Sequence, residues 1–150
     1  MTSKDAINRP FVNAMFYEEP AGTFVDGYVF RTLPDLTSVQ KDPDNGYWHC
    51  DIAHHEGLTW SEKVYELFGI RAGTPVERQW AVAHYSDRSR SALERVRTFG
   101  LKKDLGFILD AEITPEGMAT RWIRVLAVPM LADGRVVGLQ GVKRALQPLA

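Results

Sequence analysis

The stretch GYWHCDIAHHEGLTWSEKVYELFGI, residues 46–70, combines two kinds of hydrophobic periodicity. Up to Trp60 it is typical of a β-strand, a turn and a short returning strand. Apolar residues then recur at the helical spacing i, i+3 and i+4 from Val64 to Phe68, and Gly69 follows as a stop signal. The stretch therefore predicts a β-hairpin that leads directly into a helix.

Two further helices are predicted after this first one. Residues 74–77, TPVE, have the N-cap, the proline at the first helical position and the glutamate of a capping box. A third helix is expected to begin after Ser86 or Asp87, which are both good N-cap residues, and to stop at Gly100. The basic residues of this helix predict a solvated face, and contact with an anionic ligand or an acidic partner is the alternative.

The remainder of the chain has the alternation of β-strands. Strands are predicted over residues 105–113, 120–128 and 135–143, and the Asp133-Gly134 pair indicates a tight hairpin between the last two. Residues 23–31 could form an extra strand ahead of the hairpin. A single antiparallel sheet with helices gathered on one face accommodates this order of elements.

Length, composition and charge narrow the class of protein. The chain has 150 residues, 45% of them hydrophobic and 25% charged, which is ordinary for one globular domain. A net charge of −1 argues against a dedicated nucleic-acid binder. No signal peptide and no membrane-spanning run are evident, and a single cysteine fits a reducing compartment. We therefore expect a cytoplasmic protein with no membrane partner.

Eight short words follow one another along the chain: Gly46-Tyr47-Trp48-His49-Cys50-Asp51, Leu58-Thr59-Trp60-Ser61-Glu62, Tyr65-Glu66-Leu67-Phe68-Gly69-Ile70, His84-Tyr85-Ser86-Asp87-Arg88, Pro115-Glu116-Gly117, Arg121-Trp122-Ile123-Arg124, Asp133-Gly134-Arg135 and Leu139-Gln140-Gly141-Val142. Their order and spacing resemble a PAS domain, over residues 46–144. The resemblance implies an α+β fold in which a five-stranded antiparallel sheet curves around a small cavity closed by helices. It also implies a module that senses small molecules or light, or that dimerises and binds partners, and that is usually not an enzyme.

Two departures from the family pattern affect the interpretation. The Asp-Ile-Thr word that often ends the last strand is replaced by Ala145-Leu146-Gln147, and residues 145–150 are expected to be a short tail without an effector domain. The signalling output would then pass through contact with a separate protein. The word often written His-Pro-Asp-Asp appears as His84-Tyr85-Ser86-Asp87. Because the proline is absent, the resemblance does not predict the conformation of this turn.

The histidine-rich stretch suggests a metal site, but strand geometry argues against one. Successive strand residues point to opposite faces, so His49 and Cys50 cannot easily bind one ion, and His54 and His55 fall in the turn. We predict no metal site and a buried, inert Cys50. The flavin-binding branch of the family has its reactive cysteine in an Asn-Cys-Arg-Phe word, which is absent here. Haem ligated by His84 is the remaining cofactor alternative.

Both faces of the strand over residues 120–128 are largely apolar, and one of them should not stay bare. We expect an N-terminal extension, residues 1–45, to pack on the outer face of the sheet. Dimerisation is predicted through the same region. The predicted interface residues are Phe11, Met15, Phe16, Trp122 and Leu126.

The preferred hypothesis is a free-standing, non-enzymatic PAS module of bacterial-type signalling. It would form a homodimer or bind a separate signalling protein such as a histidine kinase, and a small ligand in the cavity could modulate that contact. A cofactor-binding sensor and an enzyme on a PAS-like scaffold are the alternatives, and no cofactor is assigned. The predicted ligand-lining residues are Cys50, Phe68, Trp80, Phe107, Val125 and Leu139.

Overall fold

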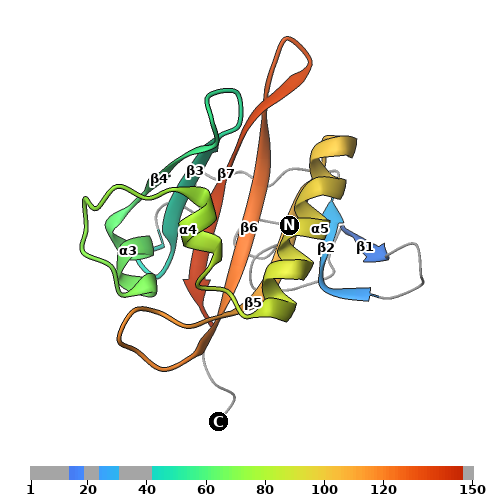
Figure 1. Cartoon of the computed structure of the whole chain (residues 1–150). Helices are drawn as coiled ribbons and strands as arrows, with labels where there is room; N and C mark the ends of the chain where they lie inside the picture. The colour runs from blue at the N-terminus through green and yellow to red at the C-terminus, as the bar shows by residue number, and fades with distance from the viewer. Residues whose placement is uncertain (1–13, 19–23, 31–41, 147–150) are drawn as a thin grey trace.

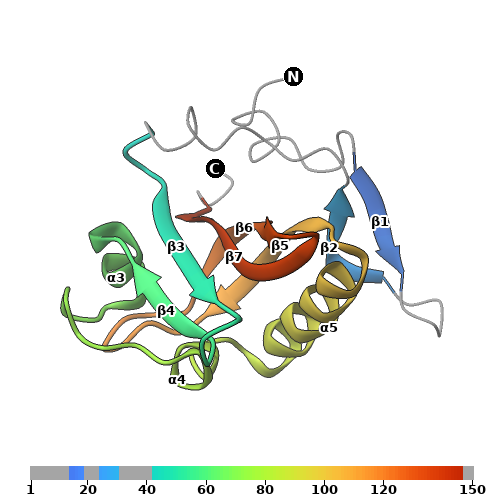
Figure 2. The ribbon, with the colours of Figure 1, turned by 90° about the horizontal axis from the view of Figure 1, so that it is seen from above.

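The strands predicted from alternating residues form one antiparallel sheet with helices on one of its faces (Figures 1 and 2). The computed structural model describes residues 14–18, 24–30 and 42–146. The strands run in the order β1-β2-β5-β6-β7-β3-β4. They are β1 (Ala14–Glu18), β2 (Phe24–Phe30), β3 (Gly46–Asp51), β4 (Gly57–Trp60), β5 (Gly106–Ile113), β6 (Arg121–Ala132) and β7 (Arg135–Ala145), and the helices are α3 (Glu62–Phe68), α4 (Arg78–Val82) and α5 (Asp87–Lys103).

Strands β3 to β7 confirm the predicted five-stranded sheet with helices on one face. The predicted extra strand is also present, as β2, and β1 pairs with it, so the two extend the sheet beyond β5. The expectation that residues 1–45 pack on the outer face depends largely on residues outside the described ranges. None of the helices in the described part of the chain is long and apolar enough to span a membrane.

Helix α5 begins as predicted and ends later than predicted. The Ser86 hydroxyl accepts a hydrogen bond from the Ser89 N–H and caps the helix. The helix does not stop at Gly100 but continues to Lys103, and Asp104 ends it with a left-handed φ of 56°. Gly100 is buried where a Cβ atom would lie 3.0 Å from the Leu105 carbonyl oxygen. Its small size therefore serves close packing rather than helix termination.

The predicted start of the second helix is wrong. The N-cap of α4 is Glu77, whose backbone is extended and forms an antiparallel bridge with Gly57. This tertiary bridge keeps Glu77 out of the helix. The hydroxyl of Thr74 donates to the Arg71 carbonyl oxygen instead of capping α4. A local capping signal is overridden here by pairing with the first hairpin.

Both faces of the central strands are apolar, as the sequence predicted. Phe107, Val125 and Leu139 belong to the core between the sheet and the helices. Ile108, Leu126 and Val142 are also buried but lie outside this core, because alternate residues of a strand point to the other face. Leu126 pairs with Ile108 on one side and with Val142 on the other, so the three form a row across β5, β6 and β7.

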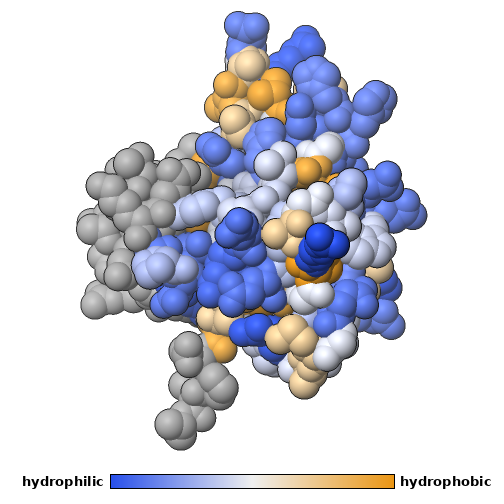
Figure 3. All heavy atoms as spheres, turned by 90° about the vertical axis from the view of Figure 1, so that its left-hand side faces the viewer, coloured by the Kyte–Doolittle hydropathy of each residue, from blue (hydrophilic) through white to orange (hydrophobic). Residues whose placement is uncertain are grey.

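The end of the sheet that carries α3 and β4 has a mainly hydrophilic surface (Figure 3). Apolar atoms form small separate groups there, and one of these groups lies on the β6–β7 hairpin at the top of the view. Leu131 is 54% exposed in this hairpin. The predicted Asp133-Gly134 turn connects the two strands with positive φ angles of 52° and 76°, as the mirror-image hairpin turns require.

Replacement of Gly141 by alanine should disrupt the pairing of β6 and β7. A Cβ atom on Gly141 would lie 1.7 Å from the backbone oxygen of Leu126, so the two strands would have to separate. We expect Gly141→Ala to lower the free energy of unfolding by about 3 kcal/mol, as overpacking of a rigid site does. Urea denaturation measures this change. Gly57→Ala in β4 is the control, because its nearest neighbour would be 3.7 Å away; equal losses for both variants would contradict the prediction.

Candidate functional site

A small cavity lies between the inner face of the sheet and helices α4 and α5. Its volume is about 50 Å³. A few water molecules or one small functional group would fill this space, whereas typical drug-sized pockets measure roughly 300–1,000 Å³. The cavity is lined by Trp48, Cys50, Leu58, Arg78, Ala81, Val82, Tyr85, Leu93, Arg97, Phe107, Val125, Leu139 and Lys143.

Lys143 projects from β7 into an enclosure of aromatic rings. The residue is only 8% exposed. Its Nζ atom lies 5.1–5.7 Å from the ring centroids of Trp48, Trp60, Phe68 and Tyr85, and it donates a hydrogen bond of 3.1 Å to the Tyr85 hydroxyl. The faces of aromatic rings attract a cation, so the enclosure partly replaces the lost hydration of the ammonium group. No carboxylate belongs to the cavity lining given above.

Burial lowers the pKa of Lys143 to about 7, and the nearby positive charge of Arg78 acts in the same direction. The amine therefore titrates close to neutral pH. Burial raises the pKa values of the neighbouring Tyr85 hydroxyl and Cys50 thiol, and both stay neutral in this range. Lys143 is consequently the group of the cavity that changes charge near pH 7.

Hydrogen-bond donors outnumber acceptors around this lysine. Trp48 and Trp60 are 8% and 7% exposed, and neither indole N–H has a hydrogen-bond partner within the described residues. A buried donor without a partner costs about 1–3 kcal/mol. Arg78 and Arg97 add two more cationic groups at the cavity wall. A ligand that offers acceptor atoms would complement this wall.

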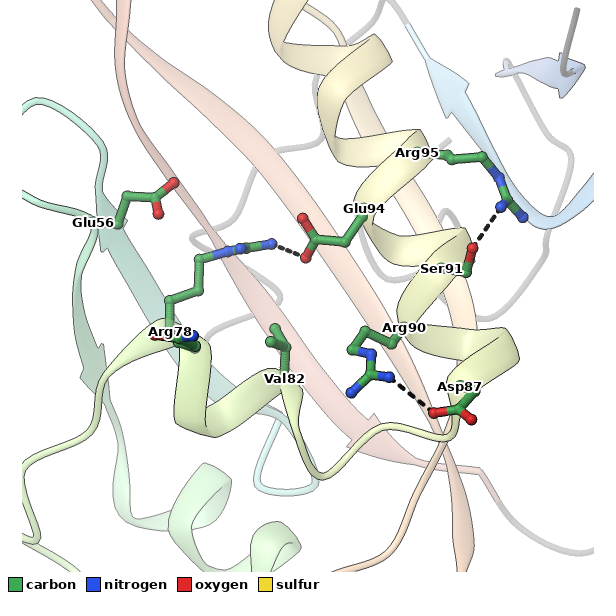
Figure 4. Close-up of a pocket in the computed structure, with 9 residues that line it drawn as sticks. Glu56, Arg78, Val82, Asp87, Arg90, Ser91, Glu94 and Arg95 are labelled. Atoms are coloured by element: carbon green, nitrogen blue, oxygen red, sulfur yellow. Dashed lines mark hydrogen bonds and ion pairs between the residues drawn. The ribbon is translucent and has the colours of Figure 1, made fainter.

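Two ion pairs separate the cavity from an outer groove of about 650 Å³. Arg78 of α4 pairs with Glu94 of α5, and Arg97 Nη2 of α5 lies 2.7 Å from Glu56 Oε1 in the turn between β3 and β4. Figure 4 shows Glu56, Arg78 and Glu94 coming from three different elements toward one point. Arg78 and Val82 line both the groove and the cavity. The ion pairs therefore form the boundary that a ligand entering from the groove would cross.

Four of the six predicted ligand-lining residues border the cavity, namely Cys50, Phe107, Val125 and Leu139. Phe68 is fully buried but stacks on Trp60 beneath Lys143 instead of lining the space. Trp80 is 39% exposed and its ring contacts His84, so the structure does not bring it to the cavity.

Sequence reasoning missed the polar half of this site. Lys143, Tyr85 and Arg78 were not among the predicted lining residues, and neither was Trp48. Strand parity would have found the lysine, because Lys143 lies four residues after Leu139 in β7 and therefore on the same face. A charged residue at an inward position of an apolar strand was the available signal.

The histidine-rich hairpin does not assemble a metal site. His54 lies 3.0 Å from the Asp51 carboxylate, and this hydrogen bond lowers the pKa of Asp51. Within the described ranges, no three His, Cys, Asp or Glu residues are placed to hold a metal ion. Cys50 is buried at 2% exposure, in agreement with the expected apolar setting of its thiol.

His84 uses both ring nitrogens in contacts with the protein itself. Its Nδ1 atom lies 3.1 Å from the Trp80 carbonyl oxygen, and its Nε2 atom lies 3.0 Å from Glu116 Oε1. The side chain connects α4 with the turn between β5 and β6 and does not border the cavity. Haem ligation by His84 would require the loss of one of these contacts.

The predicted interface residues fall into three groups. Trp122 is 44% exposed on β6, whereas Leu126 is fully buried in the same strand. Met15 and Phe16 lie in β1 at the edge of the sheet. Phe11 lies outside the described residues. Leu126 therefore does not offer its side chain to a partner in this structure.

Comparison with known proteins identifies the fold. No family model and no curated protein matches the chain. The N-terminal domain of a diguanylate cyclase with PAS/PAC sensor from Marinobacter aquaeolei has a TM-score of 0.61 at 13% identity, over 67% of this chain and 94% of that one. A sensory box histidine kinase/response regulator from Burkholderia thailandensis has a TM-score of 0.61 at 9% identity, over 75% and 85%.

The Ile74Val variant of Vivid is also similar, with a TM-score of 0.59 at 12% identity over 77% of this chain and 86% of that one. At these identities the comparisons establish the fold alone. The chain has a PAS fold, as the short words of its sequence predicted.

Replacement of Lys143 by methionine should change the pH dependence of stability. Between pH 7 and the ordinary lysine pKa of 10.5, the unfolded chain holds a proton that the folded chain has lost, so stability rises with pH. Relative to Lys143→Met, we expect the wild-type free energy of unfolding to rise by about 2–3 kcal/mol from pH 7 to pH 9. Denaturant titrations at both pH values measure it.

Lys103→Met, at the exposed end of α5, is the matched control and should keep the wild-type pH dependence. Parallel stability profiles for the wild type and Lys143→Met would show that the lysine is not buried as a titrating group.

Proposed function

We propose that the chain is a non-enzymatic PAS sensor module that binds a small molecule in its interior cavity. The observation that carries this proposal is the position of Lys143: a buried amine on the inner face of the sheet, beside indole N–H groups that have no partner among the described residues, with no carboxylate in the cavity lining. An arrangement of this kind is costly for stability, and a bound ligand that supplies acceptors would offset the cost. The reducing environment suggested by the single cysteine leads us to propose a cytoplasmic location.

The non-enzymatic part of the proposal is supported by the state of the candidate nucleophile. A reactive cysteine needs a lowered pKa and an adjacent base. Burial raises the pKa of Cys50, and its sulfur lies 3.8 Å from a backbone oxygen, that of Glu56. His, Asp and Glu do not occur in the cavity lining. The cavity is therefore better suited to binding than to nucleophilic chemistry.

A ligand in this cavity would act on the elements that surround it. The ion pairs Arg78–Glu94 and Arg97–Glu56 connect α4, α5 and the first hairpin at the entrance. Entry of a ligand must displace or rearrange at least one of these pairs, and the connected elements then shift relative to one another. Such a change at the edge of the sheet gives the module a means of signalling.

Blocking the passage between groove and cavity should abolish ligand binding. We expect at least one member of a small-molecule panel to stabilise the wild type by about 2.7 kcal/mol at one hundred times its Kd, which thermal unfolding detects. Val82→Phe should lose this stabilisation because Val82 borders both spaces. Val136→Phe, outside both linings, is the control. A panel that stabilises Val82→Phe as much as the wild type would contradict the proposal.

For the output we propose a homodimer formed through the outer face of the sheet. Trp122 is exposed there, two residues from Arg124, which makes a bidentate ion pair with Asp110 of β5. Tryptophan is enriched among the few residues that contribute most to protein–protein binding. The opposite face is occupied by the helices, and the end with α3 and β4 is mainly hydrophilic (Figure 3). A separate signalling protein such as a histidine kinase is the other occupant that an experiment could reveal.

Replacement of Trp122 should weaken this dimer. We expect Trp122→Glu to raise the dimer dissociation constant at least about tenfold, as loss of an aromatic anchor does. Sedimentation equilibrium over a range of concentrations measures the constant. Trp80→Glu is a matched control, because Trp80 has a similar exposure of 39% but lies on α4. A wild type that stays monomeric at high concentration would refute the homodimer and leave a different partner to be found.

A further inference from the structure

We propose that the ligand of the cavity is a small carboxylate, whose oxygens bind Lys143 Nζ and the indole N–H of Trp48. This inference rests on the proposed function, since it names the chemical class of the ligand that the sensor would bind. Both residues line the cavity, Lys143 Nζ lies 5.5 Å from the centre of the Trp48 ring, and the indole N–H has no partner within the described structure. A carboxylate accepts several hydrogen bonds through two oxygens, so one such group could satisfy both donors.

Charge complementarity supports an anion over a neutral or cationic ligand. The wall carries the cationic side chains of Lys143, Arg78 and Arg97. The carboxylates that compensate the arginines, Glu56 and Glu94, are 45% and 42% exposed on the outer side of the boundary. Lys143 has only the neutral Tyr85 hydroxyl as its hydrogen-bond partner among the described contacts. The interior therefore has a local excess of positive charge that an anion would neutralise.

The volume of the cavity and its apolar lining indicate which kind of anion it could bind. A space of about 50 Å³ holds a group of a few heavy atoms. Apart from the donors, the wall is formed by apolar side chains such as Phe107, Val125 and Leu139. A phosphate ester would bring two charges and a larger hydration shell into this apolar space, at a high desolvation cost. A monoanion with a short apolar tail fits the surroundings better.

Binding of a carboxylate should be accompanied by proton uptake at Lys143. An adjacent negative charge favours the ammonium form, so it raises the pKa of the lysine from its value in the free protein. The charged and titratable groups of the same cavity wall are Tyr85, Cys50 of β3, Arg78 of α4 and Arg97 of α5. The two arginines are paired with Glu94 and Glu56. The tyrosine and the thiol stay neutral near pH 7, because burial raises both pKa values.

The test uses isosteric probes that differ in charge. The full chain is titrated with acetate, propionate and butyrate, and in parallel with butyramide and butylammonium. Indole N–H resonances in ¹H–¹⁵N spectra report contact, and Trp48→Phe and Trp60→Phe assign them. We expect a carboxylate to shift the Trp48 signal and butyramide to bind at least about tenfold more weakly, as loss of a charged hydrogen-bond partner implies.

Two substitutions of Lys143 and one control substitution test whether the lysine itself binds the carboxylate. Lys143→Met and Lys143→Gln should both abolish carboxylate binding while retaining dispersed spectra, and Lys103→Met should bind as the wild type does. Calorimetry at pH 8 in Tris and in triethanolamine should reveal uptake of close to one proton. The affinity should fall as pH rises above 7, by up to about tenfold per pH unit until the pKa of the bound state is reached.

The outcomes separate this inference from the proposed function. Equal binding of butyrate and butyramide, or binding that persists in folded Lys143→Met, would overturn the carboxylate assignment and leave a sensor of another ligand class. Stabilisation by neutral compounds only would also overturn the carboxylate assignment and leave a sensor of another ligand class. If no compound of any charge enters the cavity of the wild type, the carboxylate assignment and the proposed ligand-sensing function both fail.

Discussion

Burial of one ammonium group constrains the centre of this protein. Lys143 is placed on the inner face of β7 by strand alternation, and the fold must compensate for its desolvation. Four aromatic rings do so, from β3, the end of β4, the end of α3 and the segment before α5. Trp60 stacks on Phe68 at a centroid distance of 4.8 Å, so even the packing of α3 contributes to the enclosure. The lysine thus connects elements that are far apart in the sequence.

The buried lysine is also linked electrostatically to the ion pairs at the entrance of the cavity. The aromatic rings surround the ammonium group, and Arg78 and Arg97 line the same cavity, while their carboxylate partners Glu94 and Glu56 line the outer groove. Positive charges therefore accumulate inward and negative charges outward across a short distance. A change in the charge of Lys143, or the binding of an anion beside it, would change the electrostatic energy of both ion pairs, Arg78–Glu94 and Arg97–Glu56. The sheet, α4, α5 and the first hairpin would respond together, as the proposed sensor function requires.

The sequence predicted the sheet and the order of the elements because strand alternation, turn residues and the cap of α5 are local properties. It failed where packing in the folded chain overrides a local signal. Thr74 and Glu77 look like a capping box, but the bridge from Glu77 to Gly57 moves the start of α4 to Arg78. Gly100 looks like a helix stop, but it lies inside the helix, where the carbonyl oxygen of Leu105 leaves little room for a side chain. Trp80 looks like a lining residue, but its place on α4 directs it toward His84 and solvent.

The candidate site also shows how far the sequence alone predicts the structure. In β3, alternation brings Trp48 and Cys50 to the cavity and places His49 between them on the other face. The residue types that usually suggest chemistry, histidine above all, are thereby directed away from the interior. The groups proposed to bind a ligand are instead a lysine and a tryptophan, residue types that sequence inspection ordinarily assigns to the surface and to the core. Parity along β3 and β7, more than residue type, determines which side chains can meet a ligand in this fold.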